Sequence, residues 1–429
     1  MRIGLALLSM LPAACATAPA PPPASPAPHY AIAIDAAQPA FADVTLTVRQ
    51  APEALVPARA GDGSGLSDVR CADGRAVVRS GGRWLPPPGC TQFRWRVALD
   101  PLDGRGLDAS VPAAAYSARQ AYWVLPERDM LLRASGAGGT ATLSLRRTDG
   151  GRIVRRYRLP SDQQPPFYAV VGTRPAASYV REGLALSVYG APPAFPWMDA
   201  IHADVLAAWN RWRRDLVAGP SPDRIDWAWV EPAASQEPGY NASAGAEAIV
   251  SQIRLRDGDP DAEAKARAVI ATSAAHEGFH SLTGAAGQAW PAWVNESLAS
   301  HFAIEAVRGF LSPADFRFVE RFYVEPELHG PLLAAQAAFA EGDGDQAQLF
   351  YIHGARFWRE IEAVLHVPPN GSGRLAALIH SSRNFAGVDL ASAGALAAFL
   401  DRHSAGRAGP IVRCYLEGQG CMARFPQSQ

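Results

Sequence analysis

The sequence predicts a multidomain α+β protein in which an antiparallel β-domain of sandwich type is followed by a mostly helical domain. Two observations favour this fold class. Between residues 29 and 190, short segments alternate apolar and polar residues and are broken by Gly, Pro and Asp, as is typical of antiparallel strands with one face in water. In residues 191–429, apolar residues recur at helical spacing over longer segments. A chain of 429 residues can bury a sizeable core in each part.

Each part divides into expected elements. The clearest strands of the β-domain are residues 42–50, 92–100, 141–149 and 152–160. The helices expected in the second part are residues 197–217, 261–284, 291–309 and 344–366, with one strand at 247–257. Pro291 suits a first helical position, and Gly284 and Gly309 suit helix C-termini. The second part is therefore expected to contain only a little sheet.

The N-terminal residues predict export. Residues 1–18 hold a positive charge at Arg2, then an apolar run, then small residues, which is the order found in a signal peptide, and the run is too short to span a membrane. Cys15 follows "LPAA", which resembles a bacterial lipobox, where the cysteine becomes the lipid-carrying N-terminus; ordinary signal cleavage nearby is the alternative. Residues 19–28 are a Pro-rich linker that favours an extended spacer. We therefore expect a protein of the periplasm or envelope, attached to the membrane, if at all, through a lipid on Cys15.

The remaining cysteines predict disulfides. Cys71, Cys90, Cys414 and Cys421 are an even number in a chain expected to be exported. Pairing Cys71 with Cys90 and Cys414 with Cys421 is the simplest of the possible connectivities, because each bond closes a local loop. Four unpaired thiols are the alternative, which an oxidising compartment disfavours.

The charge composition limits the kind of partner. The 40 basic and 41 acidic side chains nearly cancel. Such a balance produces no overall field that would attract nucleic acid or an anionic membrane surface. We therefore expect a specific small ligand, peptide or protein as the partner, and the composition indicates no oligomeric state.

The segment "AAHEGFHSLTG" (274–284) is the first candidate for chemistry. On a helix that turns about 100° per residue, His276 and His280 project from one face a turn apart, with Glu277 beside them. Two imidazoles so placed can share one Zn²⁺ and leave the carboxylate next to an activated water. Coincidence in an alanine-rich helix is the alternative, so the interpretation needs a third ligand.

Glu296 is the expected third ligand, and fifteen residues separate it from His280. A metzincin would continue the motif with a glycine and a third histidine, but Thr283 and Ala286 occupy those positions. A gluzincin instead takes a glutamate from the following helix. On that helix Glu296 shares a stripe with Ala292, Ala299, Ala303 and Val307. A carboxylate in such a stripe must be paired or bind a metal, because burying it alone is too costly; a solvent-facing acid near a helix N-terminus is the alternative.

Three segments resemble the gluzincin peptidases, in particular the aminopeptidase N-like and glycyl aminopeptidase-like families. "HEGFH" and "WVNESLA" are similar to their HExxH and W-x-N-E-G-x-A motifs, and "FYIHGARFWREIE" (350–362) is similar to their Y-x-K-G-A helix. The resemblance covers about residues 195–400 and implies a thermolysin-like catalytic domain holding one zinc ion. It gives Tyr351 the role of a hydrogen-bond donor to the tetrahedral intermediate. His353 replaces the family lysine, and the loop before Glu296 is shorter than usual in these families.

Glu247 is the candidate for recognising a free amino group. Aminopeptidases of the first family carry G-x-M-E-N on an edge strand before the zinc helix, and its glutamate binds the substrate's amine. In "SAGAEAIVSQI" (243–253), Glu247 stands near the matching position, although the methionine and asparagine are absent. An ordinary polar residue at the start of a strand is the alternative.

These residues together predict zinc-dependent hydrolysis of peptide bonds at the cell envelope, with aminopeptidase activity expected. Zinc on His276, His280 and Glu296 would activate a water, and Glu277 would take its proton and pass it to the leaving amine. Two alternatives belong to other classes. The scaffold could be an envelope binding protein with a structural metal, or a zinc hydrolase of a non-peptide amide.

Overall fold

The computed structural model describes residues 27–58, 65–109, 113–135, 141–147, 155–159, 167–190, 195–219, 221–232, 237–245, 247–256, 258–288, 290–325 and 328–420. The expected signal segment with Cys15, nearly all of the Pro-rich linker, and Cys421 lie outside these residues. The lipidation of Cys15 and the bond between Cys414 and Cys421 therefore stay predictions. None of the described helices combines the length and the apolar character needed to cross a bilayer.

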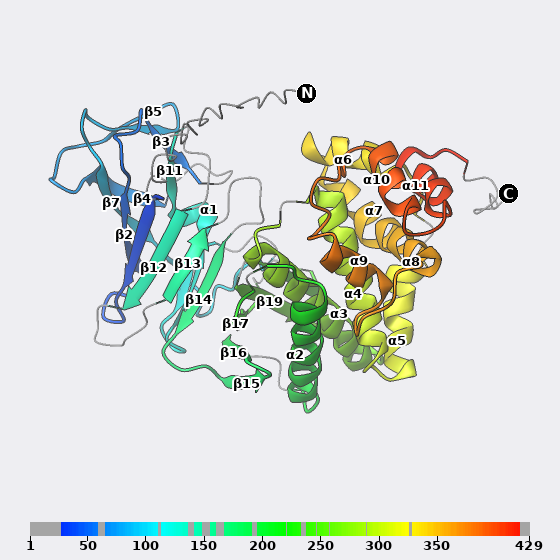
Figure 1. Cartoon of the computed structure of the whole chain (residues 1–429). Helices are drawn as coiled ribbons and strands as arrows, with labels where there is room; N and C mark the ends of the chain where they lie inside the picture. Colours follow the sequence, from blue (N-terminus) through cyan, green and yellow to red (C-terminus); the bar gives the residue numbers. More distant parts are fainter. Residues whose placement is uncertain are drawn as a thin grey trace, which may run out of the picture.

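The N-terminal part is built on a six-stranded sheet of order β13-β12-β1-β2-β7-β4 (Figure 1). Its strands are β1 (His29–Ile34), β2 (Phe41–Thr47), β4 (Leu66–Cys71), β7 (Gln92–Ala98), β12 (Ala141–Arg147) and β13 (Arg155–Leu159). Alternate residues of the central strands, such as Val44 and Leu46 on β2 and Phe93 and Trp95 on β7, are buried, while their neighbours face water. The alternation in the sequence thus corresponds to one dry and one wet face.

Two smaller sheets lie against the dry face. One has the order β14-β10-β9-β8 and the other β11-β3-β6-β5. Their strands are β3 (Leu55–Pro57), β5 (Val78–Ser80), β6 (Arg83–Leu85), β8 (Asp100–Pro101), β9 (Ala115–Ser117), β10 (Tyr122–Pro126), β11 (Leu132–Ala134) and β14 (Tyr168–Gly172), with the short helix α1 (Glu127–Met130) after β10. Leu55, Trp123 and Leu125 share one core with the buried residues of β2 and β7. The sandwich-type arrangement is confirmed.

The six-stranded sheet is mixed, which corrects the expectation of purely antiparallel strands. β1 pairs with β2 in antiparallel fashion but with β12 in parallel, from His29 opposite Thr142 to Ile34 opposite Arg147. Alternation of apolar and polar residues reports which face of a strand is buried. It carries no information on the direction of the neighbouring strand, so the sequence could not reveal this pairing.

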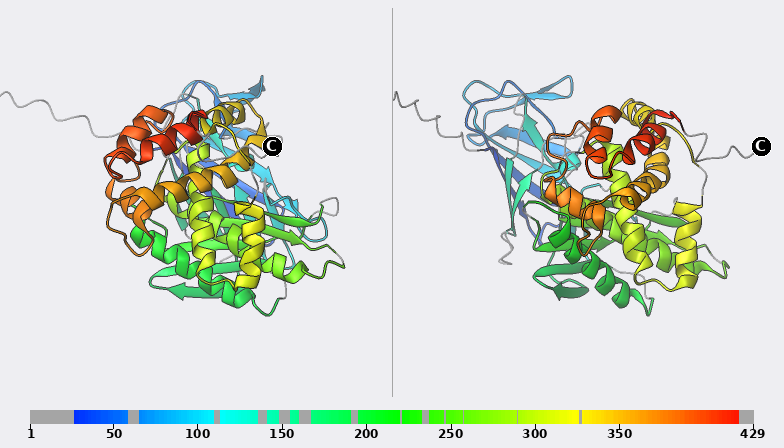
Figure 2. Two further views of the ribbon diagram at one scale, coloured as in Figure 1. Left: turned by 90° about the vertical axis from the view of Figure 1, so that its right-hand side faces the viewer. Right: turned by 45° about the vertical axis from the view of Figure 1, so that its right-hand side comes forward.

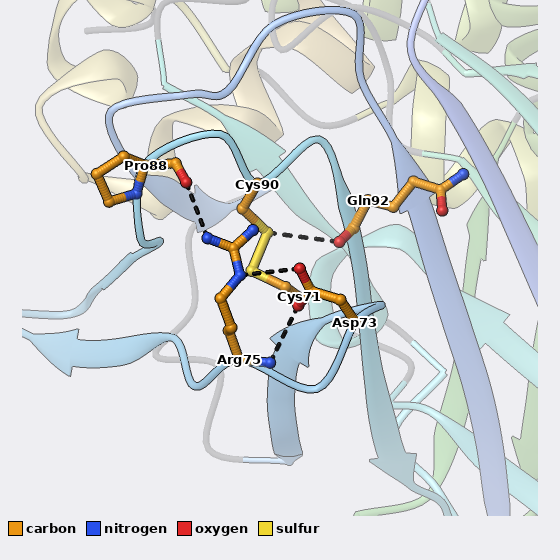
Figure 3. Close-up of a disulfide and its surroundings, with 6 residues drawn as sticks. All are labelled: Cys71, Asp73, Arg75, Pro88, Cys90 and Gln92. Carbon is orange, nitrogen blue, oxygen red and sulfur yellow. Dashed lines mark hydrogen bonds and ion pairs between the residues drawn. A yellow bond between two sulfur atoms is a disulfide. The ribbon is translucent and has the colours of Figure 1, made fainter.

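A disulfide links Cys71 at the end of β4 to Cys90 just before β7 (Figure 3). The expected bond between Cys71 and Cys90 is therefore present, and both residues are buried. Arg75, in the loop that the bond closes, donates hydrogen bonds to Asp73 and to the carbonyl of Pro88. The bond and these contacts fix an irregular segment that has little regular secondary structure of its own.

Removing this bond is expected to destabilise the sandwich. The cysteines are 19 residues apart in sequence, and a loop of that size corresponds to about 3 kcal/mol of stability in the chain-entropy model. We expect the free energy of unfolding of the variant Cys71→Ala/Cys90→Ala to be lower by about 3 kcal/mol, which appears as a lower denaturant concentration at the unfolding midpoint. Reduction of the unsubstituted protein should lower the free energy of unfolding by at least as much, because it also breaks the disulfide of Cys414, and unchanged unfolding in both experiments would contradict the stabilising role.

A five-stranded sheet connects the sandwich to the helices, in the order β15-β16-β17-β19-β18. Its strands are β15 (Ala177–Arg181), β16 (Leu184–Gly190), β17 (Arg224–Trp229), β18 (Gly239–Ala244) and β19 (Ala248–Arg254). The three central strands are parallel, and β15 and β18 are antiparallel edge strands. One face packs on helices and the other on β10 and β14, through residues such as Tyr122, Val124, Ala228 and Val250. Figure 2 shows the strand-rich part and the helices on opposite sides of this sheet.

The expected division at residue 190 falls inside this sheet. The expected boundary assigns β15 and β16 to the β-domain, yet β16 pairs with β17 from Ala185 opposite Arg224 to Gly190 opposite Trp229. Leu186 and Val188 on β16 lie in the same core as the helices. The second part therefore holds more sheet than expected, because a strand's partners are not encoded in its own periodicity.

Three expected helices are present with nearly the expected bounds: α2 (Met198–Asp215), α3 (Ala262–Ala285) and α4 (Ala292–Arg308). The segment expected at 344–366 contains α7 (Ala347–Leu349) and α8 (Ala355–Val364). Within the described part of the chain, five further helices lie outside the expected segments: α5 (Pro313–Val319), α6 (Leu332–Ala340), α9 (Arg374–Ser381), α10 (Ala393–Asp401) and α11 (Ala408–Glu417). Aromatic side chains join the first three: the ring centroid of Phe279 lies 6.1 Å from that of Trp212 and 5.6 Å from that of Phe302. The α+β class with a helical C-terminal part is confirmed.

The helix expected at 344–366 is not uniform. A 3₁₀ turn (Gly344–Gln346) and α7 lead into a π-helical turn, Phe350–Gly354, which continues as α8. A second π-helical turn, Glu320–Val324, follows α5. Turns of this kind are rare in proteins, and those that do occur are often found at functional sites. Both lie near the zinc-binding motif, as described next.

Candidate active site

Helices α3 and α4 bring three predicted ligands together. His276 and His280 stand one turn apart on α3, and Glu296 lies in the first half of α4, which packs directly on α3. The Nε2 atoms of the two histidines are 3.0 Å apart, and Glu296 Oε2 lies 3.1 Å from His276 Nε2 and 3.2 Å from His280 Nε2. Ala299, Ala303 and Val307, on the stripe of Glu296, are fully buried as expected.

This donor set fits a zinc ion. Two imidazole nitrogens and one carboxylate oxygen are the ligands of many catalytic zinc sites, and donors that share a tetrahedral ion with bonds of about 2.0–2.2 Å lie roughly 3.3 Å apart. The three measured separations are within a few tenths of that value. Among the described residues, these three also form the group of His, Cys, Asp and Glu side chains able to hold a metal. The residues present therefore fit the metal that the sequence predicts.

The electrostatics of the cluster favour a bound cation. Burial alone would raise the pKa of the Glu296 carboxyl, but the two histidines hold it well below its usual range. Burial alone would lower the pKa of His280, but the Glu296 carboxylate outweighs it and raises the pKa to about 9. The cluster thus attracts positive charge, which a proton on His280 or a metal ion can supply.

Ser300 supports the cluster and was missed in the sequence. Its Oγ lies 3.3 Å from Nδ1 of His276, on the side of the ring away from the other ligands. A ring whose Nε2 faces a metal carries its hydrogen on Nδ1, so His276 can donate to Ser300 and keep its orientation. The spacing of four residues between Glu296 and Ser300 was the available signal, since it puts both on one face of α4.

Glu277 has the environment of a proton-transfer group. Burial raises the pKa of its carboxyl, while His276 and His280 oppose the rise. Besides burial, the negative charge of Glu277 contributes to raising the pKa of two tyrosines, Tyr240 on β18 and Tyr323 in the π-helical turn Glu320–Val324. The Tyr323 side chain also hydrogen-bonds to Ser273. A carboxyl with a raised pKa beside the ligand cluster is suited to taking and returning a proton near neutral pH.

Tyr351 is placed beside the cluster by the π-helical turn Phe350–Gly354. Its ring packs edge-on to that of His276, with centroids 5.6 Å apart. The close approach of this π-helical turn to α4 depends on Gly354, because a Cβ at that position would lie 2.5 Å from Cβ of Ser297 on α4. The Glu296 carboxylate and burial raise the pKa of the Tyr351 hydroxyl, which therefore stays protonated and able to donate. The predicted oxyanion donor is thus within the site.

His353, which stands at the family's lysine position, points elsewhere. It is buried, and its ring stacks on Tyr415 of α11 with centroids 4.4 Å apart. Burial lowers its pKa to about 4, with His329 contributing. A neutral ring within the helical core explains how the chain accommodates the change from lysine.

Glu247 lies directly before β19, and its backbone carbonyl accepts a hydrogen bond from the amide of Asp226. The edge strand that contacts α3 is β18, which pairs with β19 from Gly239 opposite Arg254 to Ala244 opposite Ile249, beside the turn that precedes Glu247. The role of Glu247 as amine anchor stays a prediction. The sequence placed Glu247 on the edge strand, whereas "GYNASA" (239–244) forms it.

Comparisons with solved structures identify a similar fold. An aminopeptidase N family protein from Idiomarina loihiensis has a TM-score of 0.54 and 13% identity, over 93% of this chain and 73% of that chain. An M1 zinc metallopeptidase from Deinococcus radiodurans has a TM-score of 0.49 and 16% identity, over 91% of this chain and 93% of that chain. No family model and no curated protein matches the sequence. The first similarity confirms the fold expected from the three motifs.

Proposed function

We propose that this protein is a zinc-dependent peptidase with its active site between α3 and α4. The observation that carries the proposal is the convergence of His276, His280 and Glu296 within 3.2 Å of one another, with the Glu277 carboxylate adjoining them. The fold shared with an aminopeptidase N family protein supports the same activity class. A binding protein with a purely structural metal would have no use for a base at this position.

The chemistry divides among these groups. His276, His280 and Glu296 would hold a zinc ion, which would supply a Lewis acid that lowers the pKa of water, so that a nucleophile for a carbonyl could form at neutral pH. Glu277 accepts the proton of the attacking water and returns it to the amine that leaves. The Tyr351 hydroxyl donates a hydrogen bond to the oxygen that becomes negative when the carbonyl is attacked.

Aminopeptidase specificity and an envelope location are part of the proposal. The fold supports the first, and the signal-like residues 1–18 with Cys15 support the second. Selectivity for a free amino group requires an acidic group near the ligand cluster, and Glu247 is the candidate that the sequence offers.

The experiment that tests the function combines metal analysis with peptide hydrolysis. We expect the purified protein to contain one zinc per chain and to cleave peptides with free N-termini faster than peptides with blocked N-termini. A chelator should remove both metal and activity, and added zinc should restore both. Zinc without hydrolysis of any peptide would favour the binding protein, and cleavage restricted to non-peptide amides would favour the second alternative.

Tyr351→Phe is expected to lower kcat by about 10²–10³-fold, the loss typical when one oxyanion donor is removed. KM and zinc content should change little, because phenylalanine keeps the ring that packs on His276. Steady-state kinetics with one peptide and a metal assay measure both quantities.

Tyr116→Phe is the matched control, since Tyr116 lies on β9 in the sandwich. It should leave kcat and KM unchanged. If Tyr351→Phe retained the kcat of the unsubstituted protein, the hydroxyl would have no part in the reaction.

A further inference from the structure

A cavity of about 320 Å³ lies beside the candidate site, between the end of the β18–β19 hairpin and the first half of α3. Its volume is within the range of pockets that bind small ligands. Its apolar lining comes from four elements: β18, β19, α3 and the π-helical turn Glu320–Val324. The residues used below are Tyr240, Ile253, Ala262, Ala266, Val269 and Phe322. The cavity is not part of the ligand cluster, so it needs an explanation of its own.

The stripe of α3 that lines the cavity leads to the ligand cluster. Ala262, Ala266 and Val269 follow a spacing of four and three residues that continues through Ser273 to His276, so all five share one stripe. Val269 precedes His276 by two helical turns, or about 10 Å. Tyr240 lines the cavity, and the charge of Glu277 acts on both Tyr240 and Tyr323.

Part of the lining is an exposed apolar side chain. Phe322 lies in the π-helical turn Glu320–Val324, next to Tyr323, and is 52% exposed. Leu255, 37% exposed, also lines the cavity. The other large exposed hydrophobic side chains among the described residues lie on strands β2, β5, β6 and β15. Apolar surface left in water around a concave site usually marks a place where something binds.

Charged residues also line the cavity. Lys265 Nζ and Asp259 Oδ2 form an ion pair of 2.8 Å and so neutralise each other, while Arg254 and Arg256 leave the lining with net positive charge. Ala266, Val269 and Ile253 offer only apolar side-chain atoms to a ligand. An occupant therefore gains mainly by removing apolar surface from water.

We propose that this cavity binds a large apolar side chain of the peptide substrate, at least about three residues from the bond that is cut. The proposal rests on the peptidase function proposed above and deepens it. At about 3.3 Å per residue, three residues of extended peptide span the 10 Å between His276 and Val269. The substrates are then oligopeptides of four or more residues with an aliphatic or aromatic side chain remote from the cleaved bond.

The test is a set of octapeptides with one leucine moved along an otherwise glycine- and serine-based sequence around a fixed cleavage site. We expect leucine at one remote position to raise kcat/KM by about tenfold or more over glycine, as burial of a side chain of this size permits. Phe322→Ser and Ala262→Trp should both reduce this ratio, the first by removing an apolar part of the lining and the second by filling the cavity. Phe322→Leu should largely keep it.

The matched control is Val180→Ser, which removes another exposed apolar side chain, 76% exposed, on β15. It should leave the leucine-to-glycine ratio unchanged. A protein that cleaves these peptides without preference at any remote position overturns the proposal, and so does a ratio unaffected by both cavity variants.

A failure of the proposed function would look different, because then none of the peptides is cleaved. In that case the same peptides, fluorescently labelled, are tested for binding by anisotropy with the unsubstituted protein and Phe322→Ser. Tighter binding of the leucine peptide, lost in Phe322→Ser, supports the cavity as a peptide site without catalysis. Equal binding of the leucine and glycine peptides overturns it.

Discussion

Glu277→Gln is expected to lower the rate of peptide hydrolysis by about 10²–10⁴-fold, the range associated with loss of a positioned general base. Glutamine has nearly the same shape but cannot accept a proton, so the step that generates the nucleophile fails. Zinc content should stay at the level of the unsubstituted protein, because Glu277 is not among the three groups that converge on the metal position. Single-turnover kinetics and metal analysis of the same preparation measure both results.

Glu341→Gln is the matched control, since Glu341 is an exposed residue directly after α6. It should have no effect on either measurement. A zinc-loaded Glu277→Gln protein with undiminished turnover would remove Glu277 from the mechanism and leave the proposed chemistry without a base.

Gly278→Ala is expected to destabilise the protein by about 3 kcal/mol, at the upper end of the usual cost of overpacking a core. A Cβ at position 278 would lie 1.9 Å from Nε1 of Trp209, a fully buried side chain of α2. Alanine's better helix propensity recovers only about 1 kcal/mol of this loss. Since Gly278 follows Glu277 directly, a shift of α3 away from α2 should also lower activity. Denaturant unfolding and kinetics detect the two effects.

Two further variants make this prediction specific. Trp209→Phe makes room at the contact, so Gly278→Ala should cost less in the double variant than alone, which is a coupling between neighbours. Gly344→Ala is the control, because a Cβ at Gly344 would meet no atom within 4 Å, and its effect should stay within about 0.5 kcal/mol. An unchanged free energy of unfolding for Gly278→Ala would contradict this prediction, because it would mean that α2 and α3 can move apart at little energetic cost.

The ligand cluster could be predicted because its geometry is local. A spacing of four residues fixes His276 and His280 on one face of α3 without reference to the rest of the fold. Glu296 needed one further inference, that the next helix packs against the first, and the apolar stripe of Ala299 and Ala303 indicated its inner face. Both helices begin and end within about a residue of the expected bounds.

The predictions about the edge strand and the domain boundary differ from the structure for another reason, because both depend on which strands pair with each other. Glu247 was assigned to the edge strand, but the hairpin turns before it and makes "GYNASA" the edge. β16 was assigned to the β-domain, but it pairs with β17. In both cases the residues of one strand are compatible with several partners, and only packing of the complete sheet selects among them.

The groups around the cluster were missed because they come from distant segments. Tyr323 and Phe322 reach the site through a π-helical turn, and Tyr240 reaches it from β18. No spacing rule links those positions to residue 276. The cavity they border exists only once α3, the hairpin and the turn after α5 are assembled.

The π-helical turn Phe350–Gly354 also limits how this segment can change in length. α8 is anchored in the core by Phe357 and Trp358, which are fully buried, and the turn sets the rotational phase of Tyr351 relative to that anchor. Deleting one residue would convert the turn to regular α-helix and rotate everything before it by about 100°. The tyrosine would then face away from His276 although every chemical group of the site was still encoded. The segment is thus constrained in length as strictly as in sequence, so that insertions or deletions there are inactivating where many substitutions are not.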